Sequence, residues 1–167
     1  LYRQIQAEKQ RLIKEGKIKK EKPLPEIAED EIPFDIPDSW KWVRLPEIGT
    51  SSLGKTLNKR LDIGNEVPYL CSINVYWDGI NLNQIKTAKF SAADMEKYLL
   101  RRGDLLICEG GDVGRSAVWD SDVEMYYQNA LHRVRFHDNI NPYFFKFVVE
   151  YYKGIGIIDK HSKGVTI

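Results

Sequence analysis

The sequence predicts an α+β fold with a largely antiparallel sheet, and two observations support this prediction. From Trp40 onward, short apolar or alternating segments are separated by Gly, Asn and Asp, which is typical of strands joined by turns. The predicted strands are residues 41–45 (KWVRL), 67–75 (VPYLCSINV), 87–90 (TAKF), 103–109 (GDLLICE), 115–119 (RSAVW) and 130–136 (ALHRVRF). Helical segments interrupt them, so a few helices accompany the strands.

Two helices within this region carry start signals. The first is predicted from Ser91 to Leu100, because Ser91 followed three residues later by Asp94 resembles a capping box. The second is predicted from Asn141 to Gly154, with Asn141 as the N-cap and Pro142 at the first helical position.

An amphipathic helix is predicted at the N-terminus. Residues 1–22 carry eight basic and three acidic side chains, and Leu1, Ile5 and Leu12 fall on one helical stripe. The helix is expected to end near Gly16. Such a charged segment is most often solvated surface, and the functional alternative is packing on another helix.

Residues 23–39 (PLPEIAEDEIPFDIPDS) predict an extended linker. This segment has four prolines, six acidic residues and no basic one, and proline prevents a regular helix or a central strand. The sequence is therefore expected to divide into residues 1–39, a helix with a Pro-rich acidic linker, and residues 40–167, the α+β domain.

Composition sets limits on function. The 167 residues include 25 Lys and Arg against 24 Asp and Glu, with a net charge of +1, so any DNA contact must rest on local groups. Cys71 and Cys108 are far apart, which argues against a disulfide framework or a zinc site and favours a reducing cytoplasm. No apolar run approaches a membrane span and no signal peptide is present, although a start at Leu1 suggests a fragment.

The stretch GTSSLGKT, Gly49 to Thr56, fits the phosphate-loop pattern G-x-x-x-x-G-K-[ST]. That pattern binds nucleotides only when a buried strand precedes the loop and a helix follows it. Here the preceding segment alternates, and Gly64 and Pro68 would end any helix within about two turns. A P-loop nucleotide-binding protein is therefore the alternative prediction, and whether a helix begins at Thr56 separates the two.

The segment GDLLICEGGDVGRSAVW, Gly103 to Trp119, is the most informative. Three glycines within five residues lie between two apolar strands, which allows another backbone, such as a phosphodiester, to approach closely. Arg115 follows this loop and suits a phosphate clamp. A glycine turn with a surface Arg is an equally good interpretation of these residues alone.

Several other patterns favour structural roles. Residues 141–144 (NPYF) resemble an adenine-methyltransferase motif but lack one proline, so they are interpreted as a helix start. His132 and His137 fall on opposite faces of a strand and cannot share a metal. No catalytic residue, metal or cofactor is predicted. Trp77 lies by a turn and is a candidate for DNA contact. The aromatic residues expected in the core are Tyr143, Phe144, Phe147 and Tyr151 with Val148, and also Trp40, Trp42 and Trp119.

Separated segments of the chain together resemble a half of the specificity subunit of type I restriction–modification systems. They are AEKQRLIKEGKIKKEK, EIPFDIPDSWKWVRLPEIG, GDLLICEGGDVGRSAVW, YQNALHRVRF and HSKGVTI. The resemblance implies one target-recognition domain, from about Trp40 onward, preceded by the end of a conserved helix. In that family two such domains are joined by helices that form an antiparallel coiled coil, and each domain recognises half of a split DNA target.

The resemblance also implies partners and a site. The partners are double-stranded DNA, methyltransferase (modification) subunits, a restriction subunit and the coiled-coil helix of the same or a second specificity chain. The stretch after Gly49 becomes a DNA-contacting loop, and nucleotide chemistry belongs to other subunits. Asn, Gln, Arg and Lys on loops suit base edges and phosphates. The predicted DNA-contacting residues are Lys55, Thr56, Lys59, Arg60, Asn74, Gly110, Gly111, Arg115, Gln128, Asn129, His132 and Lys163. A third possibility is an interaction scaffold that uses only the N-terminal helix.

Overall fold

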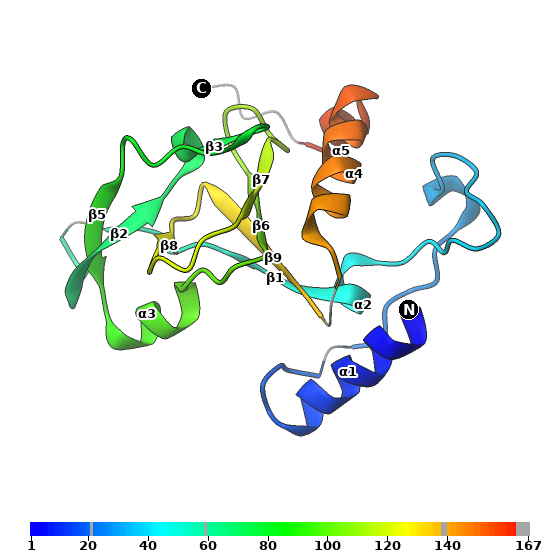
Figure 1. The fold of residues 1–167 in the computed structure, drawn as a ribbon, viewed down its shortest axis with the longest axis horizontal. Coiled ribbons are helices and arrows are strands. Elements are labelled where there is room, and N and C mark those ends of the chain that lie inside the picture. Colours follow the sequence, from blue (N-terminus) through cyan, green and yellow to red (C-terminus); the bar gives the residue numbers. More distant parts are fainter. Residues whose placement is uncertain (21, 59, 138–139, 163–167) are drawn as a thin grey trace. The chain divides into compact units, whose positions relative to one another are not determined.

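The computed structural model describes residues 1–20, 22–58, 60–137 and 140–162 (Figure 1). The chain divides into two compact units. One contains Leu1–Thr50 with Phe136–Ile140, and the other contains Ser51–Arg135 with Asn141–Ile167. Each unit is described by itself below.

The first unit contains α1 (Tyr2–Lys14), the short 3-10 helix η1 (Glu29–Glu31) and α2 (Leu45–Ile48). Ile5 is the buried residue of α1. The Tyr2 hydroxyl donates to the Glu47 carboxylate at 2.5 Å, and the Gln6 amide donates to the Glu47 carbonyl at 2.9 Å, so α1 packs on α2. The predicted N-terminal helix and its end near Gly16 are confirmed.

The predicted strand at residues 41–45 is wrong, because residues 41–44 have no regular structure and α2 begins at Leu45. The Glu47 carboxylate accepts the Arg44 N–H at 2.6 Å and caps α2. The Arg44 guanidinium donates to the carbonyls of Pro25 at 2.8 Å and Glu26 at 2.9 Å. Arg44 therefore holds the Pro-rich linker rather than pairing with a neighbouring strand.

The second unit is built mainly from strands. It contains most of β1 (Gly49–Leu53) and of β9 (Leu131–Phe136), and all of β2 (Asn65–Leu70), β3 (Val75–Tyr76), β4 (Gly79–Ile80), β5 (Lys86–Phe90), β6 (Asp104–Cys108), β7 (Ser116–Trp119) and β8 (Tyr126–Tyr127). They form sheets ordered β1-β9-β6-β7, β5-β2-β8 and β3-β4. The β6–β7, β6–β9, β2–β5 and β3–β4 pairs are antiparallel, whereas β2–β8 is parallel. The α+β, largely antiparallel prediction is confirmed.

The predicted strand at residues 67–75 is interrupted after Leu70 by the 3-10 helix η2 (Ser72–Asn74). Asn74 causes the interruption, because its side-chain oxygen accepts the Cys71 N–H at 3.0 Å. Its side-chain nitrogen donates to the carbonyls of Asn81 at 3.0 Å and Gln84 at 3.2 Å. Asn74 is 1% exposed, so its amide is fully used inside the fold.

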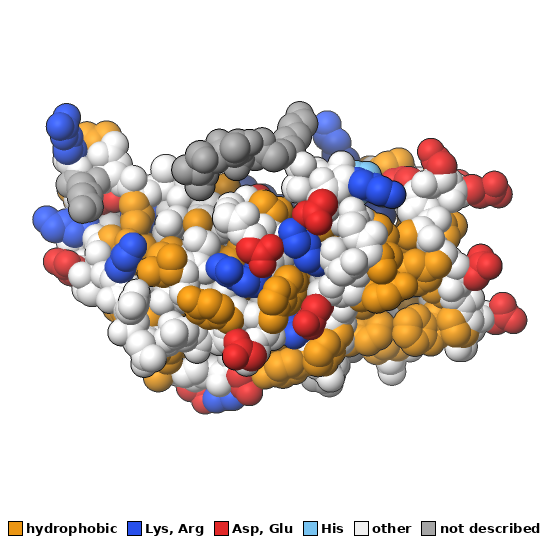
Figure 2. Space-filling view, turned by 90° about the horizontal axis from the view of Figure 1, so that it is seen from above, with side chains coloured by type: hydrophobic (Ala, Val, Ile, Leu, Met, Phe, Trp, Pro, Cys, Tyr) orange, Lys and Arg blue, Asp and Glu red, His pale blue; other side chains and the backbone are white. Residues whose placement is uncertain are grey.

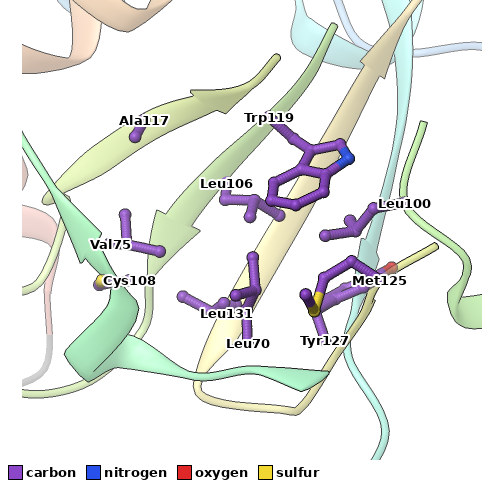
Figure 3. Packing of buried hydrophobic residues seen from close by; sticks show 10 residues of the cluster. All are labelled: Leu70, Val75, Leu100, Leu106, Cys108, Ala117, Trp119, Met125, Tyr127 and Leu131. Atoms are coloured by element: carbon purple, nitrogen blue, oxygen red, sulfur yellow. The ribbon is translucent and has the colours of Figure 1, made fainter. Parts of the chain in front are cut away.

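The main core lies between β6, β7, β9 and the segments around β2 and β8 (Figure 3). Trp119 is its largest member and is 1% exposed. Figure 3 shows its indole ring packed among side chains from separate strands. The other members are Leu70, Val75, Leu100, Leu106, Cys108, Ala117, Met125, Tyr127 and Leu131. The core position predicted for Trp119 is confirmed, but Trp40, at 55% exposed, and the half-buried Trp42 are not core residues.

Both helix start signals are confirmed in α3 (Ala92–Tyr98) and α4 (Pro142–Gly154). Ser91 caps α3 by accepting the Asp94 N–H at 3.2 Å, and Asn141 caps α4 by accepting the Tyr143 N–H at 3.0 Å. A further helix, α5 (Ile157–His161), was not predicted. None of the helices in the described part of the chain is long and apolar enough to cross a membrane.

The core position predicted for the aromatic residues of α4 is wrong. The exposed fractions are 43% for Tyr143, 43% for Phe144, 60% for Phe147 and 53% for Tyr151. The helix is apolar on more than one side, and it packs on β7 and β6 (Figure 1). A helix packed on one sheet buries one face, so these rings face solvent.

Candidate nucleic-acid interface

The apparent phosphate loop does not have the structure that nucleotide binding requires. Its first half, Gly49–Leu53, is strand β1, and no helix begins at Thr56 in the described residues that follow. The next helical element is η2 at Ser72. The P-loop alternative is therefore wrong, because the backbone N–H groups of a helix N-terminus are missing from this position.

Lys55 is 8% exposed, although the phosphate-loop pattern would require its ammonium to face a ligand. Its Nζ lies 2.7 Å from the Asp94 carboxylate and 3.1 Å from the Asp62 carboxylate. Burial lowers the pKa of Lys55, but the hydrogen bonds and the attraction of the two carboxylates outweigh it and raise this pKa above its ordinary value. The ammonium is charged and already neutralised by the protein.

Backbone hydrogen bonds bring three segments together around Lys55. The Asn129 N–H donates to the Lys55 carbonyl at 3.0 Å, and the Gly54 N–H donates to the Leu131 carbonyl at 3.1 Å. A Cβ on Gly54 would lie 2.4 Å from the Gln128 carbonyl oxygen, so only glycine permits this approach. The Glu109 N–H donates to the Ala130 carbonyl at 2.9 Å, and this bond joins the glycine-rich loop to the other two segments. We call Gly54–Thr56, Glu109–Arg115 and Gln128–His132 together the three-loop surface.

The glycine-rich loop of this surface is folded on itself. Gly111 is exposed and has φ +74°, and a Cβ added to it would have nothing within 4 Å, so its backbone is open to a close-approaching ligand. The Gly114 N–H donates to the Cys108 carbonyl at 3.0 Å, and the Arg115 N–H donates to the Asp112 carbonyl at 3.1 Å. Gly110 lies beside Gly111 and is half-buried.

The Arg115 side chain points into the protein rather than away from the loop. Its guanidinium donates to the Ser72 carbonyl at 2.8 Å and lies 5.1 Å above the centroid of the Tyr76 ring. Tyr76 is 40% exposed and Ile73, close by on η2, is 42% exposed. These two apolar residues were not among the predicted contacts. The predicted candidate Trp77 is half-buried and has the Lys146 ammonium 5.8 Å from its ring centroid.

Gln128, Asn129 and His132 differ in what their side chains offer a ligand. The Gln128 side-chain oxygen accepts the Ala130 N–H at 2.7 Å, which closes a turn. The Nδ1 atom of His132 lies 2.7 Å from the Glu109 carboxylate. Asn129 is exposed, and its side chain forms no hydrogen bond with another residue in the described chain.

Thr56 and Arg60 follow Lys55 closely in the sequence. Both are exposed, and Arg60 lies on a turn where its N–H donates to the Asn58 side-chain oxygen at 3.1 Å. Lys59 and Lys163 lie outside the described residues. The structure therefore brings Thr56, Asn129 and the glycine-rich loop together as exposed groups, and it gives the side chains of Lys55 and Asn74 internal partners.

The charged side chains near the centre of Figure 2 are of both signs. Figure 2 shows Lys and Arg side chains interspersed with Asp and Glu on the face in view, without an extended basic patch among the side chains drawn in colour. Within the described residues, no group of three or more His, Cys, Asp or Glu side chains could hold a metal ion, and Cys71 and Cys108 are buried, free thiols. A nucleic acid at this surface would meet few cations and several hydrogen-bonding groups.

Two curated relatives from Escherichia coli match the sequence. The chain is 40% identical over 92 residues to the type I restriction enzyme EcoEI specificity subunit, a match covering 52% of this chain and 14% of that subunit. It is 46% identical over 66 residues to the EcoAI specificity subunit, covering 40% and 10% respectively. The chain thus spans a small part of these relatives' length. No protein-family model matches it.

Two solved structures have the same fold. The HsdS subunit from Thermoanaerobacter tengcongensis superposes with a TM-score of 0.55 at 20% identity, over 81% of this chain and 32% of that one. A chain from a structure of type I R-M system assembly and conformational transition gives 0.52 at 20% identity, over 96% and 37%. The predicted resemblance to type I specificity subunits is confirmed in sequence and in fold.

Proposed function

We propose that this relative of the type I specificity subunits is a sequence-specific DNA-recognition module. It would direct methyltransferase and endonuclease subunits to one half of a bipartite target. The observation that carries the proposal is the 40% identity to a type I specificity subunit over 92 residues. The module itself would be non-catalytic and would work in the cytoplasm, where such an assembly meets genomic DNA.

The three-loop surface is the proposed contact with double-stranded DNA. It presents an exposed amide at Asn129, a hydroxyl at Thr56 and the open backbone of Gly111. An amide suits a base edge, whereas a hydroxyl and backbone N–H groups suit phosphate. Arg60, on the neighbouring turn, would supply a phosphate contact. Because few cations face solvent here, hydrogen bonding rather than bulk charge would give this module its discrimination between sequences.

We further propose that residues 40–167 form the target-recognition domain, and that residues 1–39 comprise a helix end and a linker. Helix α1 would continue the spacer of the complete subunit and pack on the coiled-coil helix of the same or a second specificity chain. Leu1 is 78% exposed and Leu12 is half-buried, so the stripe that they share with Ile5 has room for a partner helix.

An exchange of recognition domains tests this function. Residues 40–167 would replace the corresponding domain in a second type I subunit, and methylome sequencing of a host carrying each complete system would identify the modified sequence. We expect one half of the split target to change and the other half to persist. A target that remains unchanged, or that changes in both halves, would contradict the proposal.

A further inference from the structure

Lys55 connects several segments of the candidate interface, because its side chain and its backbone contact different parts of the chain. The ammonium contacts Asp94, at the start of α3, and Asp62, at the end of a turn. The backbone carbonyl accepts the Asn129 N–H at 3.0 Å, and the backbone N–H donates to the Tyr127 carbonyl at 3.1 Å. One residue thus fastens two loops to the body of the second unit.

Both fastened loops carry exposed side chains. The Asp62 carboxylate accepts the Asn58 N–H at 2.7 Å, and the Asp62 N–H donates to the Asn58 carbonyl at 2.8 Å. Arg60 is exposed within this turn, and Asn129 is exposed on the other loop. Recognition requires such groups to be held within about 0.5 Å of their working positions. Their placement therefore depends on the contacts that Lys55 makes.

The same contacts make Lys55 a poor ligand for phosphate. Two carboxylates face one ammonium, and the Phe90 ring lies with its centroid 5.3 Å from Nζ. A phosphate would have to displace a carboxylate from a group that is 8% exposed, and the carboxylate left behind would repel it.

We propose that Lys55 is a positioning residue of the DNA interface, which holds Arg60 and Asn129 in their DNA-contacting orientation and makes no phosphate contact itself. The inference rests on the proposed function, because it requires a DNA target. Under this inference, Lys55 contributes to sequence specificity although its ammonium does not contact DNA.

The test uses the full-length specificity subunit in its assembly with methyltransferase subunits, titrated on cognate and scrambled duplexes at several salt concentrations. Lys55→Met keeps the aliphatic stem and removes the charge. We expect about a tenfold loss on the cognate duplex, because the Lys55 main chain whose carbonyl accepts the Asn129 N–H loses its carboxylate anchors. We expect a smaller loss on the scrambled duplex, because the turn that carries Arg60 loosens and Arg60 contacts phosphate in both duplexes. Equal losses on both duplexes would make Lys55 a phosphate contact and overturn the inference.

Removing the Asp94 carboxylate is expected to change the affinity for DNA in opposite directions, depending on whether Lys55 positions the loops or contacts phosphate. If Lys55 positions the loops, Asp94→Asn weakens cognate binding. If Lys55 contacts phosphate, Asp94→Asn releases the ammonium, removes a negative charge and tightens binding to both duplexes. Ser91→Ala is the matched control, because it removes the other half of the α3 cap and leaves the ammonium its carboxylate. A cognate loss in Ser91→Ala equal to that in Asp94→Asn would assign the effect to α3 and overturn the inference.

A second variant keeps the inference testable if Lys55→Met does not fold. Asp62→Asn leaves the Lys55–Asp94 pair intact and loosens only the turn that carries Arg60. Weaker binding to both duplexes supports positioning, because Arg60 contacts phosphate, whereas equal or tighter binding contradicts it. A wild-type assembly that binds both duplexes equally would contradict the proposed function, whereas unchanged binding to both duplexes in every variant would contradict only the role of Lys55.

Discussion

Asn129 is the residue at which the candidate interface offers a complete side-chain amide. A bidentate contact with adenine uses both the oxygen and the nitrogen of one amide. Asn129 is exposed with both atoms available among the described residues, whereas the Gln128 oxygen already accepts the Ala130 N–H at 2.7 Å. The two neighbouring amides are therefore expected to differ in function.

Replacing each amide separates base recognition from turn formation. Asn129→Ala should cost about 1–3 kcal/mol of binding free energy on the cognate duplex and little on a scrambled one. Gln128→Ala should act mainly through the turn and give a smaller cognate loss. Titration of both variants, within the assembled subunit, measures the difference.

Arg60→Ala is the control for a contact that does not depend on sequence. Arg60 is exposed on its turn, so its loss should weaken binding to both duplexes and lower the salt slope by about one. If Asn129→Ala behaved like Arg60→Ala, the assignment of Asn129 to a base edge would be wrong.

Strands β6 and β9 are joined by a buried ion pair as well as by their ladder. The Arg135 guanidinium binds the Asp104 carboxylate through contacts of 2.7 and 2.6 Å, and Asp104 is fully buried. The same carboxylate accepts the Arg101 N–H at 2.8 Å. This pair holds β6 and β9 together at one end. Glu109 and Leu131, which belong to the three-loop surface, lie at the other end of these two strands.

Breaking this ion pair should destabilise the fold. Arg135→Met leaves the Asp104 carboxylate buried without its partner, so we expect the free energy of unfolding to fall by about 3 kcal/mol. Urea denaturation measures this loss. Arg102→Ala removes a guanidinium that is paired with Asp120 and Asp122 on the surface, and its effect should be much smaller. Similar losses in the two variants would show that burial of the pair contributes little.

The Pro-rich linker is held by an acid-sensitive contact. The Arg44 guanidinium and the Ala28 N–H bind the Glu31 carboxylate and lower the pKa of Glu31 from its ordinary 4.5 to about 2. A carboxyl with a lowered folded-state pKa stabilises the fold above its unfolded pKa, and this contribution disappears as the pH falls through the folded value. The anchor should therefore be complete above about pH 4.5 and lost toward about pH 2.

Hydrogen exchange tests the anchor at neutral pH. Glu31→Gln removes the charge, so the amides of residues 28–32 should exchange faster than in the wild type. Glu29→Gln is the matched control, because Glu29 lies in the same 3-10 helix and has no carboxylate contact with Arg44 among the described contacts. Faster exchange in both variants would indicate general loss of η1 rather than loss of the Arg44 contact.

At the scale of the whole molecule, the sequence predicts elements well where local signals and tertiary partners agree. Ser91 and Asn141 cap the helices that they were expected to cap. The prediction fails at residues 41–45, because alternation suggests a strand but the Glu47 side chain, which accepts the Arg44 backbone N–H, favours α2. Strand β1 was missed because its residues, Gly49–Leu53, are mostly small and polar, and pairing with other strands decides their conformation.

The candidate site was harder to predict than the fold. Residue type and spacing pointed to loops that the backbone brings together, but not to the direction of each side chain. Lys55 has the residue type of a phosphate ligand, yet the carboxylates of Asp62 and Asp94 hold it inside the protein. Arg115 turns toward the Ser72 carbonyl for a similar reason. Such partners depend on contacts across 7 to 43 positions of the chain, which residue type and spacing do not reveal.

The complete subunit should protect helix α1 more than this chain alone does. Helices of about 12–15 residues are marginal in isolation, and here Ile5 is the buried residue of α1. We therefore expect residues 2–14 to exchange their amide hydrogens more slowly in the full-length assembly than in the isolated 167-residue chain. Equal exchange in both would contradict packing of α1 on a coiled-coil helix.

The three-loop surface is joined mainly by main-chain hydrogen bonds, and this has a consequence for substitutions. The bonds from Asn129 to Lys55, from Gly54 to Leu131 and from Glu109 to Ala130 use no side-chain atoms. A substitution at an exposed position such as Asn129 changes what the surface offers and keeps these bonds. Under the proposed function, a substitution at Asn129 would change the DNA sequence that is recognised at little cost in folding, whereas a substitution at Gly54 or at the buried Lys55 would disturb the scaffold.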